Sequence, residues 1–196
     1  MSEGSNITEK QIVAGDPTVF AIGYAFVDRS KTTEISMFIN GDNILGFTKQ
    51  GNQYTTRWAY LDGIVGWLNE FALTMHADPY PVSAEGDFAA QKDCNARTFF
   101  SEDFDEMDAY YTLLNDWTYE HTWLSERAGA ILANVYFEYK DGIVELSWNN
   151  LEDHDGASFD CKFGSARVDA KVFKSVVRTF VDAYEKHWGT TLDRQE

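Results

Sequence analysis

Two pairs of β-branched and aromatic segments, each interrupted by a short turn of Gly and Asp, constrain the fold most. The first turn is Gly41–Asp42 and the second is Asp141–Gly142. Gly and Asp tolerate the positive φ angles of tight turns, so each pair predicts an antiparallel β-hairpin. The paired segments are EISMFIN (34–40) with NILGFTK (43–49), and AILANVYFEYK (130–140) with GIVELSW (142–148).

Each half of the chain offers one more strand. TVFAIGYAFVD (18–28) is rich in β-branched and aromatic residues, and ASFDCKFG (157–164) alternates apolar and polar side chains. Both patterns are typical of strands.

The hydrophobic period changes from two to about 3.6 residues in three places, which predicts three amphipathic helices. The first spans 57–75 and ends before Pro79, and the second spans 102–126 with Ser101 as its N-cap. The third spans 169–188 and stops at Gly189, a residue suited to the left-handed C-terminal cap.

Hairpins followed by helices indicate an α+β fold in which antiparallel sheet packs on helices. We expect about six strands and three main helices in the order βββα-α-βββα, with two halves similar in architecture but not in residues. The length of 196 residues favours one domain over 1–196. Within it, 1–16 is expected to be a loose tail and 77–100 a long irregular loop.

The chain carries no sign of export or of membrane insertion. MSEGSNITEK lacks the basic start and apolar run of a signal peptide, and no apolar stretch reaches the roughly 18 residues that span a bilayer. A soluble, cytoplasmic protein is therefore expected. Cys94 and Cys161 are too few for a disulfide scaffold and fit no zinc spacing, so both are expected to be free thiols.

The formal net charge is −16, and it is concentrated in the middle of the chain. Residues 98–161 hold 15 acidic side chains against two basic ones, Arg127 and Lys140. A surface of this sign repels nucleic-acid phosphates and anionic membranes, and it attracts basic partners. A local block of charge indicates either a face with a function or a chance accumulation, more than it indicates adaptation to salt.

The stretch SEDFDEMDAYY (101–111) begins this acidic block. Glu102 and Asp103 are explained by the first helical turn, where negative charge offsets the helix dipole. The later acids form a stripe on one helical face, where two aromatic side chains also project, and the hairpin at 138–155 adds four more acids. The predicted partner-binding residues are Asp105, Asp108, Asp116, Tyr119, Glu120, Trp123, Glu138, Glu152, Asp153 and Asp155. Alternatively, a sheet edge or the 77–100 loop covers the two aromatics.

No phosphate-binding Gly-rich loop, GxSxG, HExxH or CxxC motif is present, so no catalytic residue is assigned. No cofactor or metal is expected either. The acids of the stripe diverge around the helix, and EDHDG (152–156) does not have EF-hand spacing. A distant pocket would escape this search. Its candidate residues would be His76, Cys94 and His121, near the 77–121 region.

The stretch WTYEHTWLSERAGAILANVYFEYKDGIVELSWNN (117–150) resembles a segment of uncharacterised bacterial proteins. In these a Trp and a His lie on a helix, and an aromatic strand leads into an ISW-like strand. The matching residues are Trp117, His121, Gly129, Phe137, Ser147 and Trp148, while Ala133 stands at a position that is Pro in the pattern. The resemblance implies a bacterial or phage setting and carries over no site residue.

These patterns favour a non-enzymatic acidic protein that occludes a basic protein partner. An immunity protein or antitoxin that blocks a nuclease-like toxin fits, as does an anti-defence inhibitor that mimics nucleic acid. The partner's Lys and Arg would meet carboxylates in place of phosphates. The alternatives are an enzyme or small-ligand module with a site near 77–121, and an accessory subunit of a bacterial complex.

Overall fold

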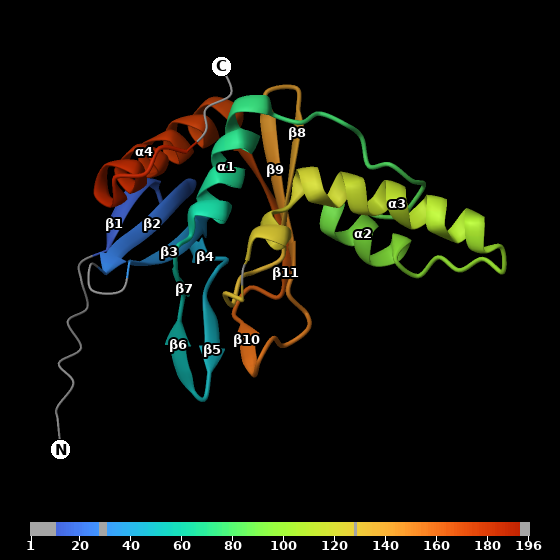
Figure 1. Ribbon diagram of the computed structural model, residues 1–196, viewed down its shortest axis with the longest axis horizontal. Helices are drawn as coiled ribbons and strands as arrows, with labels where there is room; N and C mark the ends of the chain where they lie inside the picture. Colours follow the sequence, from blue (N-terminus) through green and yellow to red (C-terminus); the bar gives the residue numbers. More distant parts are fainter. Residues whose placement is uncertain (1–10, 28–30, 128, 193–196) are drawn as a thin grey trace.

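The computed structural model describes residues 11–27, 31–127 and 129–192, and within these ranges the chain has an α+β fold (Figure 1). All of its paired strands are antiparallel, as the hairpin signals predicted. The described residues form eleven strands and four α-helices, more than the expected six strands and three helices. Most of the additional strands have only two to five residues, which is too short to give a periodic signal.

The first sheet is built from the N-terminal residues and has the order β1-β2-β3-β4, with β7 also paired to β3. Its strands are β1 (Ile12–Asp16), β2 (Phe20–Val27), β3 (Thr32–Ile39), β4 (Asp42–Asn43) and β7 (Thr56–Ala59). The expected loose tail over 1–16 is therefore wrong for β1, which pairs along its length with β2 and buries Ala14. Residues 1–10 of that tail lie outside the described ranges.

The β3–β4 turn falls one residue earlier than the sequence predicted. Ile39 pairs with Asp42, so Asn40 and Gly41 occupy the turn, with φ angles of 52° and 94°. Two consecutive positive φ angles are what a two-residue hairpin turn requires, and Asn-Gly meets this better than Gly-Asp. The Asp141–Gly142 turn is confirmed, because Lys140 pairs with Ile143 across it.

Two smaller sheets complete the β-structure. One has the order β10-β5-β6 and joins the two halves of the chain, through β5 (Phe47–Lys49), β6 (Asn52–Tyr54) and β10 (Ala157–Phe159). The other has the order β11-β9-β8, from β8 (Val135–Lys140), β9 (Ile143–Asn149) and β11 (Phe163–Asp169). The single strand predicted over 157–164 is thus divided between two sheets.

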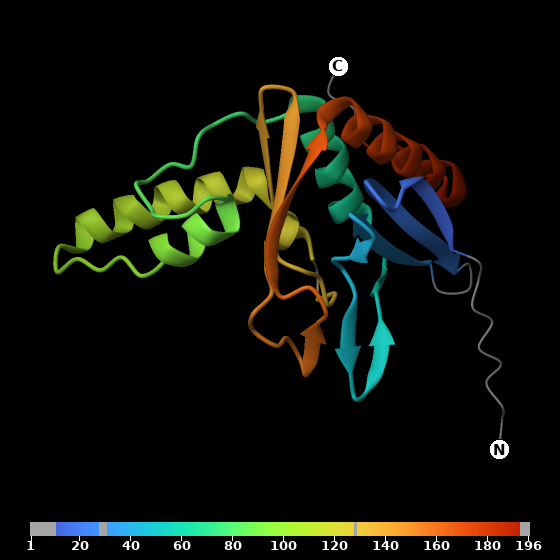
Figure 2. The same ribbon diagram turned by 180° about the vertical axis from the view of Figure 1, so that it is seen from behind.

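The helix α1 (Asp62–Thr74) lies between the first and third sheets, and α4 (Ala170–Trp188) packs on β1 and β2 of the first sheet and on α1 (Figures 1 and 2). The α4 helix agrees with the prediction over 169–188. Asp169 caps its N-terminus by accepting from the amides of Lys171 and Val172, and Gly189 takes the left-handed conformation at its end. The predicted start of α1 at residue 57 is wrong, because residues 56–59 pair with β3.

Two further helices occupy the middle of the chain, α2 (Ala89–Ala96) and α3 (Phe104–His121), and a short 3₁₀ turn, η2 (Trp123–Glu126), follows. The irregular loop expected over 77–100 therefore contains a helix, whose eight residues are too few to show an apolar period. The helix expected over 102–126 is interrupted at Thr122, which is extended with φ −150° and ψ 145°. None of the helices in these described ranges combines the length and apolarity that a membrane crossing needs.

The main core centres on Phe137 of β8, whose side chain has no exposed surface. Its ring centroid lies 5.1 to 6.1 Å from four other aromatic rings, which come from α1, η2 and α4. These are Trp67, Phe71, Trp123 and Phe173. The five rings form the aromatic hub, which packs the third sheet against the two central helices.

Replacing Phe137 with Ala should lower the free energy of unfolding by about 3–5 kcal/mol, because it leaves a cavity where four aromatic rings now find their contacts. Urea unfolding followed by circular dichroism measures this as a lower midpoint with an unchanged slope. Phe104→Ala is the control, since Phe104 is 73% exposed and should change stability by less than about 0.5 kcal/mol. Similar midpoints for the two variants would contradict the central place of the hub.

Candidate protein-binding surface

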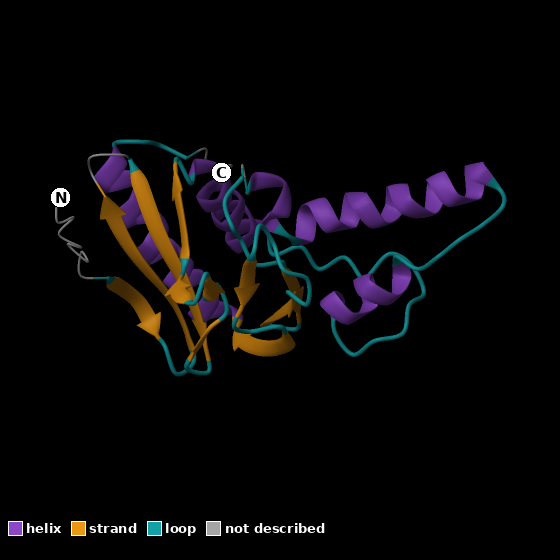
Figure 3. Ribbon diagram, turned by 90° about the horizontal axis from the view of Figure 1, so that it is seen from below, coloured by secondary structure: helices purple, strands orange, loops and turns teal. Residues whose placement is uncertain are grey.

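The helices α2 and α3 form an arm, here defined as residues 77–121, that projects sideways from the sheets (Figures 1 and 3). The arm packs on the rest of the molecule through contacts of α2 with β8 and β9 and of α3 with β8 and η2. A small apolar cluster of its own holds this joint, formed by Ala89, Ala90, Trp117 and Tyr136 with Tyr80 and Phe88 packed against it. The aromatic hub does not extend into the arm.

A capping arrangement fixes the start of α3. Asp103 is the N-cap, and its Oδ1 accepts hydrogen bonds from the amides of Asp105 and Glu106 at 2.9 and 3.3 Å. The predicted cap, Ser101, instead donates its hydroxyl to Glu106 Oε2 at 2.6 Å and accepts from the Asp103 amide. Either residue type can cap a helix, but Asp103 directly precedes the first helical residue. Asp103 is thus structural, as the N-cap. The prediction that Glu102 and Asp103 lie in the first helical turn is wrong, because the helix begins at Phe104 and the acids of its first turn are Asp105 and Glu106.

The N-terminal half of α3 is held against the end of α2 and the loop that connects the two helices. The hydroxyl of Tyr110 donates to the carbonyl of Ala96, and the ring of Tyr110 stacks on Phe99 at 4.0 Å between centroids. The hydroxyl of Tyr111 lies 3.0 Å from the carbonyls of Arg97 and Phe99. The helix is therefore held along one side, while its other side faces solvent.

Only three of the 18 residues of α3 are buried, namely Leu114, Trp117 and His121. At 100° per residue the opposite face carries the predicted acids together, and all of them are exposed: Asp105, Asp108, Asp116 and Glu120. Exposed apolar side chains border them, with Phe104 at 73%, Leu113 at 53% and Tyr119 at 62%. We call this set the acidic face of α3.

In the part of the chain that the structure describes, most carboxylates of this face have no cationic partner. Between Thr98 and Glu126 the sequence has no Lys or Arg. Within the described ranges, no ion pair involves Asp105, Asp108 or Asp116, and Glu120 has His76 Nδ1 at 3.9 Å. The carboxylates are therefore available to cations from outside the chain.

Trp123 does not belong to this surface, contrary to the prediction. Its side chain is 0% exposed, its indole Nε1 donates to the carbonyl of Ala133 at 3.0 Å, and its ring belongs to the aromatic hub. The helical projection failed because α3 ends two residues earlier, and the extended Thr122 turns the chain. Tyr119, which still lies within the helix, is exposed as predicted.

The four predicted acids of the 138–155 segment lie away from the acidic face. Glu138 is half-buried on β8, and its burial raises the pKa of its carboxyl. Glu152, Asp153 and Asp155 follow the opposite end of β9, in the loop toward β10 (Figure 1). Asp153 pairs with Lys162 at 3.1 Å, and its hydrogen bond to that ammonium group lowers its pKa. These residues form no continuous surface with α3.

Glu138 lines a cavity of about 860 Å³ between the 77–80 segment, α2 and the third sheet. Its charged lining mixes both signs, with Lys92, Lys140 and Arg167 facing Asp78, Asp87, Glu138, Asp141 and Glu145. Arg167 Nε and Glu145 Oε2 already pair at 3.0 Å. The cavity thus lacks the single sign of charge that marks α3.

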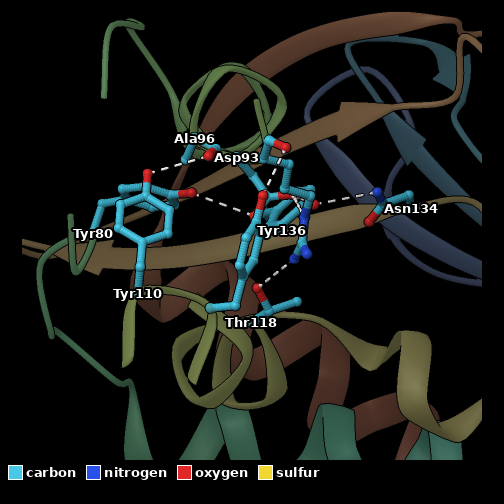
Figure 4. A network of polar contacts seen from close by, with 9 residues as sticks. Tyr80, Asp93, Ala96, Tyr110, Thr118, Asn134 and Tyr136 are labelled. Carbon is cyan, nitrogen blue, oxygen red and sulfur yellow. Dashed lines mark hydrogen bonds and ion pairs between the residues drawn. The ribbon is translucent and has the colours of Figure 1, made fainter. Parts of the chain in front are cut away.

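A buried network attaches the arm to β8 (Figure 4). Asp93 of α2 is 4% exposed and accepts from Arg97 Nε at 2.7 Å, Tyr136 hydroxyl at 2.8 Å and Tyr80 hydroxyl at 3.3 Å. Arg97 also donates to Thr118 Oγ1 on α3. Burial and the charge of Asp93 raise the pKa of both phenols, so they remain protonated donors at neutral pH. The Asp93–Arg97 spacing of four residues was visible in the sequence, but its burial was not.

The residues of the alternative small-ligand site are only partly brought together. The rings of His76 and His121 lie 6.1 Å apart between centroids, whereas Cys94 is exposed on α2. His121 is buried and stacks on Trp117 at 4.1 Å, and burial lowers its pKa so that the ring is neutral at pH 7. Asp78 and Glu120 also lie close to His76. The sequence did not predict this proximity, because the 76–78 segment and the end of α3 lie far apart in the chain.

Replacing Asp93 with Ala should loosen the arm while the rest of the fold remains intact. The change leaves two phenols and a guanidinium without their shared acceptor, which costs about 2–3 kcal/mol at this joint. Hydrogen exchange should quicken in α2 and α3 while β2 and α4 stay protected. Asp87→Ala, which removes an exposed carboxylate near the start of α2, should leave exchange unchanged. Uniform quickening over the whole chain would contradict a local role.

Comparison with known proteins gives little beyond this geometry. No protein-family model matches the chain, and no curated protein matches it. Among solved structures, the crystal structure of CdiI from Burkholderia dolosa AUO158 aligns with 88% of this chain and 99% of that chain, at 14% identity and a TM-score of 0.46. A likeness at that TM-score carries no argument, so the function has to be inferred from the residues of this chain.

Proposed function

We propose that this chain is a non-enzymatic binding protein whose acidic face of α3 occludes a basic surface of a protein partner. The observation that carries the proposal is the acidic face itself. Exposed carboxylates and exposed aromatic side chains share one side of a projecting helix, with no Lys or Arg among residues 98–126. A partner of nuclease or nucleic-acid-binding type fits, because such proteins carry clustered Lys and Arg for phosphates.

The physical roles of the two residue types differ. The carboxylates attract a basic partner over distances of about a Debye length, and so they raise the association rate and make it depend on salt. Phe104 and Tyr119 supply apolar area that loses water only in the complex, and aromatic residues of this kind dominate many interfaces. A helix that projects from its domain can also enter a groove that a flat sheet could not reach.

This chemistry fits two roles. An immunity protein or antitoxin would use it to block a toxin, and an anti-defence inhibitor would use it to mimic nucleic acid. In either case the partner's phosphate-binding cations are neutralised and its own ligand is excluded. Glu138, Glu152, Asp153 and Asp155 are left out of the proposed contact, because Glu138 is half-buried and the other three lie past the far end of β9.

The cavity of about 860 Å³ supports a second candidate, a small-ligand-binding module. Its walls offer cations and carboxylates together, which suits a zwitterionic ligand better than a phosphate. Binding there would involve Lys92, Glu138 and Arg167 and would be independent of Asp105 and Asp116. The partner experiments below therefore separate the two candidates.

Photo-crosslinking from position 119 should capture the partner in the source cells. A benzophenone amino acid in place of Tyr119 lies on the acidic face, whereas the same residue in place of Tyr60, which is 63% exposed outside the arm, is the matched control. The captured protein should be basic and should appear only with the residue at 119. Equal capture from both positions would count against α3 as the contact.

Neutralising the acidic face should then weaken binding to the purified partner by about 100-fold or more, given the coupling energies of close charge pairs. The variant combines Asp105→Asn, Asp108→Asn, Asp116→Asn and Glu120→Gln, and calorimetry at two salt concentrations measures its affinity and salt dependence. The matched control combines Asp42→Asn, Glu85→Gln, Asp141→Asn and Asp182→Asn, four exposed acids outside α3 with the same total charge change. Equal losses in the two variants would show that net charge alone matters.

The aromatic side chains of the face should contribute separately from its charge. Tyr119→Ala and Phe104→Ala should each raise the dissociation constant about tenfold or more, the range of interface hot spots, while thermal stability stays nearly constant. Tyr60→Ala should leave affinity unchanged. If the two truncations on α3 do not alter affinity, the partner does not bury this face.

A further inference from the structure

We propose that His76, Asp78 and Glu120 form a binding site for a divalent transition metal of the zinc class at the base of the arm. Each residue offers one ligand atom, and these atoms all lie within 4.8 Å of one another. The site shares Glu120 with the acidic face but differs from it in chemistry, because it combines an imidazole nitrogen with two carboxylates. It does not depend on the proposed partner.

The backbone around these ligands is fixed by contacts that do not involve the ligand atoms. Met75 takes the left-handed conformation after α1 and turns the chain toward α3. The carbonyl of His76 then accepts from the Tyr139 amide at 3.4 Å, and the carbonyl of Asp78 accepts from Trp117 Nε1 at 3.2 Å. Glu120 lies in the last turn of α3. Two separately anchored segments therefore present their side chains to one point.

The separations require only a small closure of the ligands. Zinc holds nitrogen and oxygen ligands at about 2.0–2.2 Å, which places neighbouring ligand atoms of a tetrahedral site roughly 3.4 Å apart. His76 Nδ1 and Glu120 Oε2 are 3.9 Å apart. The side chain of Glu120 is 51% exposed, so a change of rotamer can bring its carboxylate the remaining distance.

His121 supplies an independent sign that a ligand belongs here. Its Nδ1 lies 2.7 Å from the carbonyl oxygen of Phe137, and because a carbonyl only accepts, Nδ1 carries the proton. Nε2 is therefore a bare acceptor, and it is fully buried without a hydrogen-bond partner among the described residues. An acceptor left unpaired in the interior is costly.

His121 lies next to two of the three proposed ligands. The His76 ring is 6.1 Å away between centroids, and Glu120 directly precedes His121 in α3. Three protein ligands leave the fourth position of a tetrahedral metal to water. A cavity of about 230 Å³ lined by His76 and Glu120 gives that water room.

The ligand set favours zinc-class metals over calcium and magnesium. Both of the latter prefer oxygen ligands alone, whereas imidazole with carboxylates suits Zn²⁺, Co²⁺, Mn²⁺ and Fe²⁺. A bound metal would link the segment after α1 to α3. It would therefore stiffen the joint between the arm and the rest of the molecule.

Zinc titration of the tag-free, chelator-treated full chain tests the site. Calorimetry should show one equivalent bound, Co²⁺ should give the visible absorption of a low-symmetry site, and zinc should raise the melting temperature by mass action. His76→Gln and Asp78→Asn, separately, should weaken zinc binding at least tenfold while circular dichroism without metal stays unchanged. Both substitutions keep every carboxylate of α3, so the outcome is independent of the partner-binding test.

The matched control is His154→Gln with Asp155→Asn, which removes a second histidine that has acidic neighbours in the sequence. This variant should bind zinc like the unaltered chain. The proposal is overturned if zinc affinity survives His76→Gln and Asp78→Asn, or if the control alone abolishes it. It is also overturned if free zinc up to about 100 μM leaves the melting temperature unchanged, since any ligand specific for the folded state must raise it.

Discussion

The aromatic hub around Phe137 is the interaction on which the remaining structure depends. Phe71 comes from α1, Phe173 from α4 and Trp123 from η2, so the hub joins elements up to about a hundred residues apart in sequence. Each buried ring removes a large apolar area from water, and edge-to-face pairs add to this. The hub also fixes where the chain after α3 must return to the core. Thr122 is extended at this point and forms an antiparallel bridge with Tyr136 of β8, so the helix ends.

The arm lies outside this hub, and its stability has a different origin. Where the core relies on apolar burial, the arm relies on the Asp93 network and a few side chains of α3, because that helix buries only Leu114, Trp117 and His121. A region with few buried contacts opens more readily than the core. The acidic arm thus has less apolar anchorage than the core around Phe137, and its acidic face is exposed.

The sequence predicted what depends on local pattern and missed what depends on tertiary contact. The Asp141–Gly142 hairpin and α4 were correct, because turn chemistry and a sustained apolar period are local signals. β1 was missed, since its pairing with β2 and not its composition makes it a strand. Trp123 was misplaced because a helical projection was continued past a break that only packing creates. His76, Asp78 and Glu120 come together through the turn after α1, which no spacing in the sequence reveals.

Repulsion between the carboxylates of the acidic face destabilises the free protein, and a basic partner would remove this repulsion. Asp105 and Asp108 are three residues apart on α3, Asp116 and Glu120 are four apart, and like charges at these spacings destabilise a helix by about 0.2–0.5 kcal/mol per pair. The Asp103 cap and the favourable dipole at the first turn offset part of this. Among the described residues, no Lys or Arg pairs with Asp116, which lies beyond that turn. A partner that places Lys or Arg beside these carboxylates would convert the repulsion into attraction, and the free energy thus released would add to the affinity.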